Sequence, residues 1–186
     1  KINGAHLVAP NNKCINVEFK DDTGYILNRR IFDYDVSREA VKFGAEIFTK
    51  SYVEDLIYNN NVVSGVIVNY MGEKKEIISN IVIGADGVES RVGRWAGIKT
   101  NIRMKDMESA LQYSVANIHL DEPDKMIMYV GKNYAPGGYL WIFPKGEGFA
   151  NIGIGISGKY CKETTAKECL DKFIDREYPD VSILTT

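Results

Sequence analysis

The segment Tyr139-Leu140-Trp141-Ile142-Phe143-Pro144 carries the clearest structural pattern in this chain of 186 residues. Side chains alternate across a strand, so the three aromatic residues lie on one face and Leu140 and Ile142 on the other. A strand that is apolar on both faces is enclosed on both sides. The pattern alone favours a core layer for the aromatic residues. The alternative is the wall of a large apolar cavity, which suits tyrosine and tryptophan because their polar edges need a few hydrogen-bond partners.

This segment is one of four strand-like segments that predict a single antiparallel sheet. The last of them contains Gly153 and Gly155, which in a strand mark a bend or a close backbone approach. A helix follows, because Thr165 and Glu168 form a capping box and an apolar stripe continues as far as Tyr178. The four segments cover residues 109–118, 126–130, 138–143 and 149–157.

The N-terminal half mixes helix and strand patterns. Residues 15–19 alternate between apolar and polar, which predicts a half-buried strand, and the turn at residues 21–24 predicts a hairpin with residues 25–27. The apolar spacing of residues 32–43 predicts a helix that ends at Gly44. Further strand-like segments cover residues 45–49, 53–58, 62–70, 75–78 and 81–83.

These patterns predict an α+β fold with two parts. Residues 1–105 form a mixed α/β part whose hairpin strands enter the second part. Residues 106–186 form a largely antiparallel sheet with one covering helix. The chain opens at Lys1 without methionine and ends in the apolar stretch 183–186, so we expect it to be an internal piece of a longer protein.

The composition narrows the range of functions. The 23 basic and 25 acidic residues give a net charge of −2, so neither nucleic acid binding nor strong attraction to anionic lipid is expected. No apolar run is long enough to span a membrane, and no secretory signal is visible. The three cysteines (Cys14, Cys161 and Cys169) are scattered, which favours a reducing compartment and gives no metal-type spacing. His6 and His119 are too isolated to suggest a metal site.

Two local patterns offer contacts for a phosphate-bearing ligand. The turn Gly84-Ala85-Asp86-Gly87 lets the backbone approach a ligand before the helix that follows. Asp86 itself repels phosphate, so it accepts a ribose hydroxyl, holds the loop through backbone amides, or simply caps the helix. Arg29 and Arg30 offer planar forks for phosphate or carboxylate, although adjacent arginines are more often a solvated surface. No Ser–His–Asp set or carboxylate pair stands out, so any chemistry is expected to come from a cofactor.

Two motifs resemble those of known flavoproteins. Residues 81–97, IVIGADGVESRVGRWAG, resemble the Gly-Ala-Asp-Gly-x-x-Ser motif of flavin-dependent hydroxylases and their relatives. Residues 129–155 are similar to the signature of the geranylgeranyl reductase family, which includes archaeal digeranylgeranylglycerophospholipid reductases. The segments Arg29-x-x-Phe32-Asp33 and Gly44-Ala45-Glu46 also match, so the resemblance covers nearly the whole chain. The matching residues of the second motif are Tyr129, Gly137, Tyr139, Trp141, Phe143, Pro144, Gly153 and Gly155.

The resemblance implies an FAD enzyme that saturates isoprenoid double bonds by delivering a hydride and a proton from reduced flavin. It also implies a Gly-x-Gly-x-x-Gly unit before Lys1 and a further Gly-Asp motif after Thr186, so that most of the flavin site lies outside this chain. Residues 1–105 are then the central part of an FAD-binding domain, and residues 106–186 are the substrate-binding sheet. The isolated piece is expected to be inactive and to bind FAD weakly or not at all.

The resemblance also implies roles for individual residues. The positions that match the family assign Arg29 a flavin contact, Val53 a backbone contact with the adenine and Asp86 a place near the dinucleotide. No catalytic residue and no metal ligand is assigned.

The family spacing changes the preferred interpretation of Tyr139, Trp141 and Phe143 from core layer to the wall of an isoprenoid-binding cavity. The implied partners are an isoprenoid lipid and an electron donor, either ferredoxin, a deazaflavin or a nicotinamide. The expected location is cytoplasmic, with or without peripheral attachment to a membrane. Two alternatives stay open: an FAD-dependent aromatic hydroxylase, halogenase or electron-transfer dehydrogenase, and a non-catalytic isoprenoid-binding module.

Overall fold

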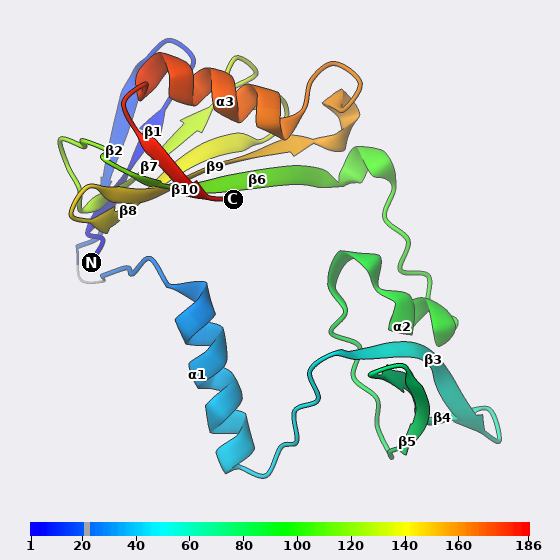
Figure 1. Ribbon diagram of the computed structural model, residues 1–186. Coiled ribbons are helices and arrows are strands. Elements are labelled where there is room, and N and C mark those ends of the chain that lie inside the picture. Colours follow the sequence, from blue (N-terminus) through cyan, green and yellow to red (C-terminus); the bar gives the residue numbers. More distant parts are fainter. Residues whose placement is uncertain (21–22) are drawn as a thin grey trace. The chain divides into compact units, whose positions relative to one another are not determined.

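A computed structural model describes residues 1–20 and 23–186 (Figure 1). The chain divides into two compact units. The first, here called the sheet unit, combines Lys1–Leu27 with Arg103–Thr186, and the second, the hairpin unit, is Asn28–Ile102. The N-terminal strands therefore belong to the same unit as the C-terminal half of the chain. Within the described parts of the chain, no helix is long and apolar enough to cross a membrane.

The sheet unit is built on one seven-stranded sheet in the order β10-β6-β9-β8-β7-β1-β2. Neighbouring strands are antiparallel except β1 and β7, which run parallel. The four strands predicted between residues 109 and 157 are confirmed. The strands are β1 (Gly4–Val8), β2 (Cys14–Glu18), β6 (Glu108–Ala116), β7 (Lys125–Val130), β8 (Tyr139–Gly146), β9 (Phe149–Ser157) and β10 (Ser182–Thr185).

The core of the sheet unit lies between the sheet and helix α3 (Ala166–Glu177), which covers one face (Figure 1). Leu140 and Ile142 point to this face and are fully buried, as the alternation along β8 predicts. From α3, Leu170 and Phe173 complete the same apolar cluster. The alternating strand thus has its aliphatic side chains in the core, and burial of each contributes about 1.5–3 kcal/mol.

The predicted capping box of α3 is confirmed. The Thr165 hydroxyl accepts a hydrogen bond from the Glu168 amide at 3.2 Å, and the Glu168 carboxylate accepts one from the Thr165 amide at 3.0 Å. We expect Thr165→Ala to lower the free energy of unfolding by about 1 kcal/mol, because the Glu168 amide loses the hydroxyl that accepts its hydrogen bond. Urea unfolding followed by circular dichroism measures this. The exposed Thr186→Ala serves as control, and equal stability of the two variants would contradict the role of the box.

The hairpin predicted between residues 15–19 and 25–27 is wrong. Strand β2 pairs instead with β1, which places Ile15 opposite Leu7. Residues 25–27 form no strand, and two backbone hydrogen bonds join Gly24 to Ile2. The predicted turn includes Asp21 and Asp22, which lie outside the described residues.

The burial predicted for β2 is also wrong, since every residue of this strand is exposed. Strand β2 lies at the edge of the sheet, and Ile15 keeps 63% of its surface accessible. The alternation of residues 15–19 is therefore present, but no element of the described chain covers its apolar side.

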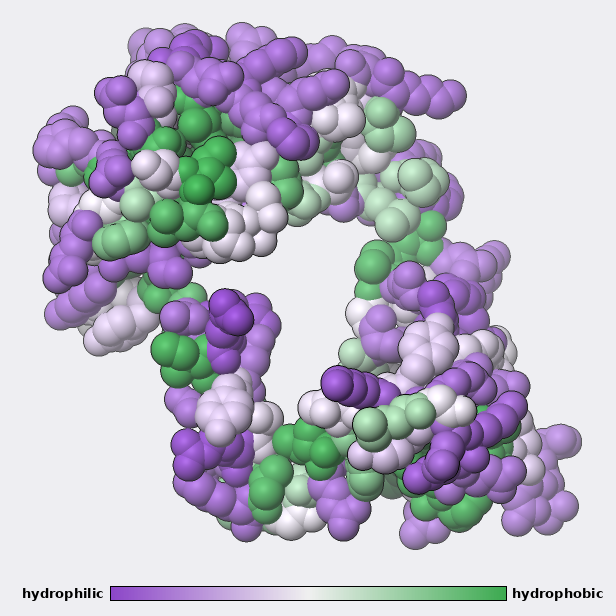
Figure 2. All heavy atoms as spheres, viewed as in Figure 1, coloured by the Kyte–Doolittle hydropathy of each residue, from purple (hydrophilic) through white to green (hydrophobic). Residues whose placement is uncertain are grey.

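The hairpin unit contains a three-stranded antiparallel sheet in the order β3-β4-β5. Helix α1 precedes it and ends as predicted, because Gly44 adopts a positive φ of 92° just beyond the last turn. No residue of α1 is buried, and Figure 2 shows hydrophobic side chains at the surface along it. The elements are α1 (Arg29–Lys42), β3 (Ser51–Asn59), β4 (Val62–Tyr70), β5 (Glu73–Ile78) and α2 (Arg91–Trp95).

Two predicted strands of this unit are wrong, residues 45–49 and residues 81–83. A strand requires a neighbour that accepts and donates its backbone hydrogen bonds. Neither segment has such a neighbour among the described residues. Ile81 and Ile83 accordingly stay 78% and 84% exposed.

Candidate functional site

An open cavity of about 390 Å³ in the hairpin unit brings together two of the three residues predicted to contact the cofactor. Val53 enters it from β3, and Asp86 enters it from the glycine turn before α2. Arg29 does not line it. The lining residues are Ser51, Tyr52, Val53, Ile83, Ala85, Asp86, Glu89, Arg91, Val92 and Trp95.

Asp86 holds the glycine turn in place. Its Oδ2 accepts a hydrogen bond from the Val92 amide in the first turn of α2, at 3.0 Å. This bond is the main reason that the pKa of the Asp86 carboxyl lies below its ordinary value. Gly87 has a φ of 70°, a left-handed conformation that glycine adopts without strain. Of the roles predicted for Asp86, the structure therefore shows the bond to a backbone amide that holds the loop, whereas the N-cap position of α2 is occupied by Ser90.

Arg29 lies in the first turn of α1 and is exposed. Its guanidinium binds Asp33, with Nε 3.0 Å from Oδ1 and Nη2 3.2 Å from Oδ2. The planar fork is thus occupied by a carboxylate four residues along the helix. A ligand that binds Arg29 has to compete with this internal partner.

The sequence assigned no site role to three other residues of the cavity, Tyr52, Arg91 and Trp95, although the last two lie within the motif of residues 81–97. The Arg91 guanidinium contacts the Tyr52 hydroxyl, and its carbon lies 5.7 Å from the centre of the Tyr52 ring. Arg91 also pairs with Glu89 at 2.7 Å. The contact between the Arg91 guanidinium and the Tyr52 ring forms only when α2 packs against β3. The sequence motif alone therefore gives no signal for it.

The aromatic residues of β8 form a continuous row on the face of the sheet opposite α3. The ring centres of Tyr139 and Trp141 are 5.7 Å apart, and those of Trp141 and Phe143 are 6.0 Å apart. The core under α3 contains Leu140 and Ile142 and none of the three aromatic rings. Tyr139 remains 44% exposed. The core-layer interpretation of the three rings is therefore wrong for this chain.

An apolar band continues from this aromatic row across the open face of the sheet. Directly paired residues of neighbouring strands share a face. The pairing places Trp141 beside Met128 of β7, Met128 beside Leu7 of β1, and Leu7 beside Ile15 of β2. The indole Nε1 of Trp141 donates a hydrogen bond to Gln112 at 3.0 Å. Because its polar atom already has a partner, the indole presents an apolar surface on this face.

Gly153 leaves the space that the Trp141 ring occupies. A Cβ atom at position 153 would lie 2.3 Å from the ring, whereas one at Gly155 meets its nearest atom at 3.6 Å. We expect Gly153→Ala to displace the indole and to lower the free energy of unfolding by about 1–3 kcal/mol. Gly155→Ala is the matched control and is expected to leave stability unchanged. Chemical denaturation of both variants tests this, and equal effects would contradict the packing described.

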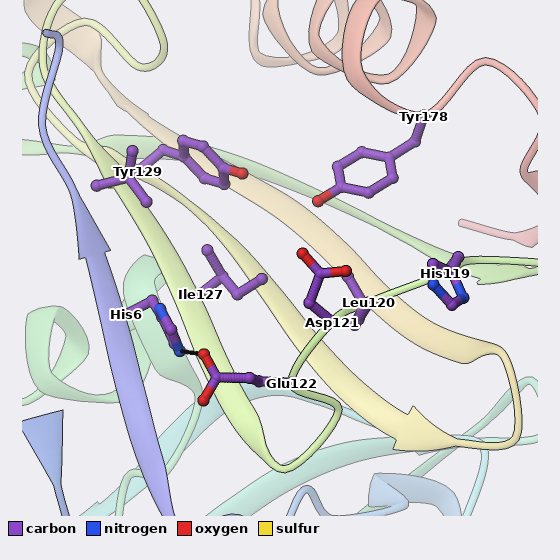
Figure 3. A pocket seen from close by; sticks show the side chains of 9 residues that line it. His6, His119, Leu120, Asp121, Glu122, Ile127, Tyr129 and Tyr178 are labelled. Carbon is purple, nitrogen blue, oxygen red and sulfur yellow. Dashed lines mark ion pairs between the residues drawn. The ribbon is translucent and has the colours of Figure 1, made fainter. Parts of the chain in front are cut away.

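A second cavity, of about 270 Å³, lies in the sheet unit on the α3 side (Figure 3). His6 and His119, which look isolated in the sequence, both line it. The hydroxyls of Tyr129 and Tyr178 point into it (Figure 3), and burial raises the pKa of both phenols. Among residues 1–20 and 23–186, no group of three or more His, Cys, Asp or Glu side chains is placed to hold a metal ion.

The chain is similar in sequence to archaeal reductases. Residues 106–186 match the model of the geranylgeranyl reductase catalytic domain. Digeranylgeranylglycerophospholipid reductase 2 of Methanococcoides burtonii is 40% identical over 98% of this chain and 46% of its own length. The enzyme of the same name from Methanosphaera stadtmanae is 41% identical over 92% of this chain and 44% of its own length. The chain spans about half the length of the curated relatives it matches.

Solved structures of similar proteins share the fold of this chain. A geranylgeranyl bacteriochlorophyll reductase-like protein from Thermoplasma acidophilum superposes with a TM-score of 0.90 at 36% identity, over the whole chain and 48% of that structure. A flavin-dependent brominase, Bmp2, has a TM-score of 0.78 at 17% identity, over the whole chain and 48% of its own, which shows a shared fold alone. The α+β fold predicted from the sequence is that of flavin-dependent proteins. Residues 106–186 thus match the geranylgeranyl reductase catalytic domain, and nearly the whole chain is similar to archaeal reductases of that name.

Proposed function

We propose that this chain is the central part of an FAD-dependent reductase that saturates double bonds of geranylgeranyl chains in archaeal membrane lipids. The observation that carries the proposal is the aromatic row of β8, which lies on an open, apolar sheet face within the residues that match the reductase catalytic domain. Residues 106–186 supply most of the substrate sheet, and residues 1–105 supply the central part of the FAD-binding domain together with strands of that sheet.

The hairpin-unit cavity offers the chemistry that the adenosine end of FAD requires. The rings of Tyr52 and Trp95 suit an adenine, Asp86 suits a ribose hydroxyl, and Arg91 suits a phosphate. We assign Val53 a backbone contact with the adenine, and we assign Arg29 a contact with the flavin once Asp33 is displaced. When bound and reduced, FAD supplies the hydride for the double bond. An electron donor, either ferredoxin, a deazaflavin or a nicotinamide, keeps it reduced.

The open sheet face suits a long hydrocarbon. Burial of each methylene group against Tyr139, Trp141 and Phe143 contributes about 0.8 kcal/mol, so several isoprene units give substantial affinity. The Trp141 indole N–H already has its partner in Gln112, so a hydrocarbon that covers the ring does not leave this donor unpaired. The chain's own residues therefore bind the lipid and exclude water along its length. Because such lipids reside in membranes, we also propose peripheral contact with a membrane surface.

The test is an activity assay on the full-length protein that contains this chain. We expect reduced FAD and a geranylgeranyl glycerolipid to give products whose masses increase by one hydrogen molecule per double bond. Unchanged lipid in the presence of reduced, bound flavin would contradict the proposal. Oxygen consumption coupled to a hydroxylated product would instead favour an FAD-dependent aromatic hydroxylase.

A further inference from the structure

Cys14, His6 and Glu122 form a chain of polar contacts that the proposed reductase does not use. The Cys14 sulfur lies 3.4 Å from Nδ1 of His6, and Nε2 of His6 lies 2.9 Å from a carboxylate oxygen of Glu122 (Figure 3). Cys14 is exposed on the edge strand β2. A nucleophile, a base within reach of it and a third group beside the base are the arrangement that activates thiols.

The sheet register brings the thiol and the imidazole together. Strands β1 and β2 pair Val8 with Cys14 and His6 with Asn16, so all four side chains lie on one face. Cys14 and His6 are diagonal neighbours on this face. The Cys14 thiol also donates a hydrogen bond to Asn16 Oδ1, 3.3 Å from the sulfur. The position of the base therefore depends on backbone pairing and not on a mobile loop.

The third group is an anion. Hydrogen bonding to Lys125, together with the charge of Lys125, lowers the pKa of the Glu122 carboxyl. The buried Nε2 atom of His6 has no hydrogen bond along its N–H direction, although the Glu122 carboxylate is close. A proton on Nε2 is thus stabilised by a nearby negative charge. This leaves Nδ1 free to accept the proton of the thiol.

We propose that Cys14 is a modification site that undergoes thiol–disulfide exchange with small disulfides, with His6 as the base. The Cys14 sulfur forms a bond with one sulfur of the disulfide while the original S–S bond breaks. Nδ1 of His6 takes the thiol proton and passes it to the departing thiolate. Cys14 is oxidised to a mixed disulfide, and the other half of the reagent is reduced to a thiol.

The other two cysteines provide internal comparisons. Cys161 is exposed, and the described residues make no hydrogen bond to its side chain. Cys169 is half-buried in α3, with its sulfur 3.3 Å from the Thr164 hydroxyl. If exposure alone governed reactivity, Cys14 and Cys161 would react at similar rates. A base at Cys14 predicts a difference between them.

The experiment treats the full-length protein with cystamine at neutral pH and quantifies the mixed disulfide at each cysteine by peptide mass spectrometry. We expect Cys14 to react about tenfold faster than Cys161, since a positioned base accelerates proton transfer by at least this factor. His6→Gln is expected to reduce the Cys14 rate to that of Cys161 while the Cys161 rate stays unchanged. Equal rates at Cys14 and Cys161 in the native protein, or a ratio that His6→Gln leaves unchanged, would overturn the proposal.

A second measurement does not depend on the variant's folding. In urea, where the strand pairing is lost, the native protein's Cys14 and Cys161 are expected to react at rates within about a factor of two of each other. A Cys14 preference that persists in the unfolded chain would show that local sequence, and not His6, controls it, and it would equally overturn the proposal.

Discussion

Leu140→Ala is expected to lower the free energy of unfolding by about 2–5 kcal/mol, the cost of deleting a fully buried aliphatic side chain. Leu140 has no accessible surface and lies in the core beneath α3, together with Ile152, Ile154 and Leu170. The well-packed helix and sheet cannot collapse to fill the space that the change creates. Denaturant unfolding followed by far-ultraviolet circular dichroism measures the loss.

The neighbouring residue Trp141 provides the matched comparison, because it lies on the opposite face of the same strand. We expect Trp141→Ala to cost less than half as much stability as Leu140→Ala, since the half-buried indole lies outside the buried core cluster, against Tyr139, Phe143 and Gln112. Equal or larger destabilisation by Trp141→Ala would mean that the aromatic row is itself a folding core. In that case the open-face account of β8 fails.

Asp86→Ala is expected to weaken FAD binding to the full-length protein by more than about tenfold, because the glycine turn loses the bond from Asp86 to the Val92 amide. Asp86→Asn keeps an oxygen that accepts this hydrogen bond, and we expect it to retain affinity within about threefold. Flavin fluorescence titration compares the two variants. Loss of binding in both would assign the charge, and not the loop geometry, as the essential property.

The pH dependence of stability tests separately whether the charge of Asp86 contributes to holding the glycine turn. The pKa of Asp86 is lowered in the folded protein, chiefly by the bond from the Val92 amide, so the carboxylate stabilises the fold above the ordinary carboxyl pKa. This contribution is lost as the pH falls through the lowered value. The stability difference between the native protein and Asp86→Ala is therefore expected to be constant near neutral pH and to vanish in strong acid. A difference that persists in strong acid would contradict this linkage.

Local signals in the sequence predicted the parts of the fold that local interactions determine. Examples are the capping box and apolar stripe of α3, the glycine end of α1 and the alternation of β8. In each of these signals, the residues that interact lie close to one another in the sequence. The wrong predictions concern pairing over longer distances. Residues 25–27 and 81–83 have strand-like composition but no partner in the described chain, whereas the short β1 pairs with both β2 and β7.

In the candidate sites, too, local motifs were visible in the sequence, whereas contacts between distant segments were not. The motif that contains Asp86 is visible in the sequence, whereas the contact between Tyr52 and Arg91 requires β3 to meet α2. The sequence also gives no hint that Cys14 and His6 are neighbours, because the pairing of β1 with β2 had to be known first. The division of the aromatic and aliphatic residues of β8 between two faces was predictable. The sequence did not predict which of these two faces helix α3 covers.

Photo-crosslinking shows whether the isoprenoid chain lies against the aromatic row of β8. The full-length protein with bound FAD is irradiated with a geranylgeranyl lipid that carries a diazirine in mid-chain, and the labelled residues are mapped by mass spectrometry. We expect label on Tyr139, Trp141 or Phe143 that excess unmodified lipid prevents. Saturable label that is confined to α3 or to the hairpin unit, with none on β8, would exclude the aromatic row as the lipid-binding surface.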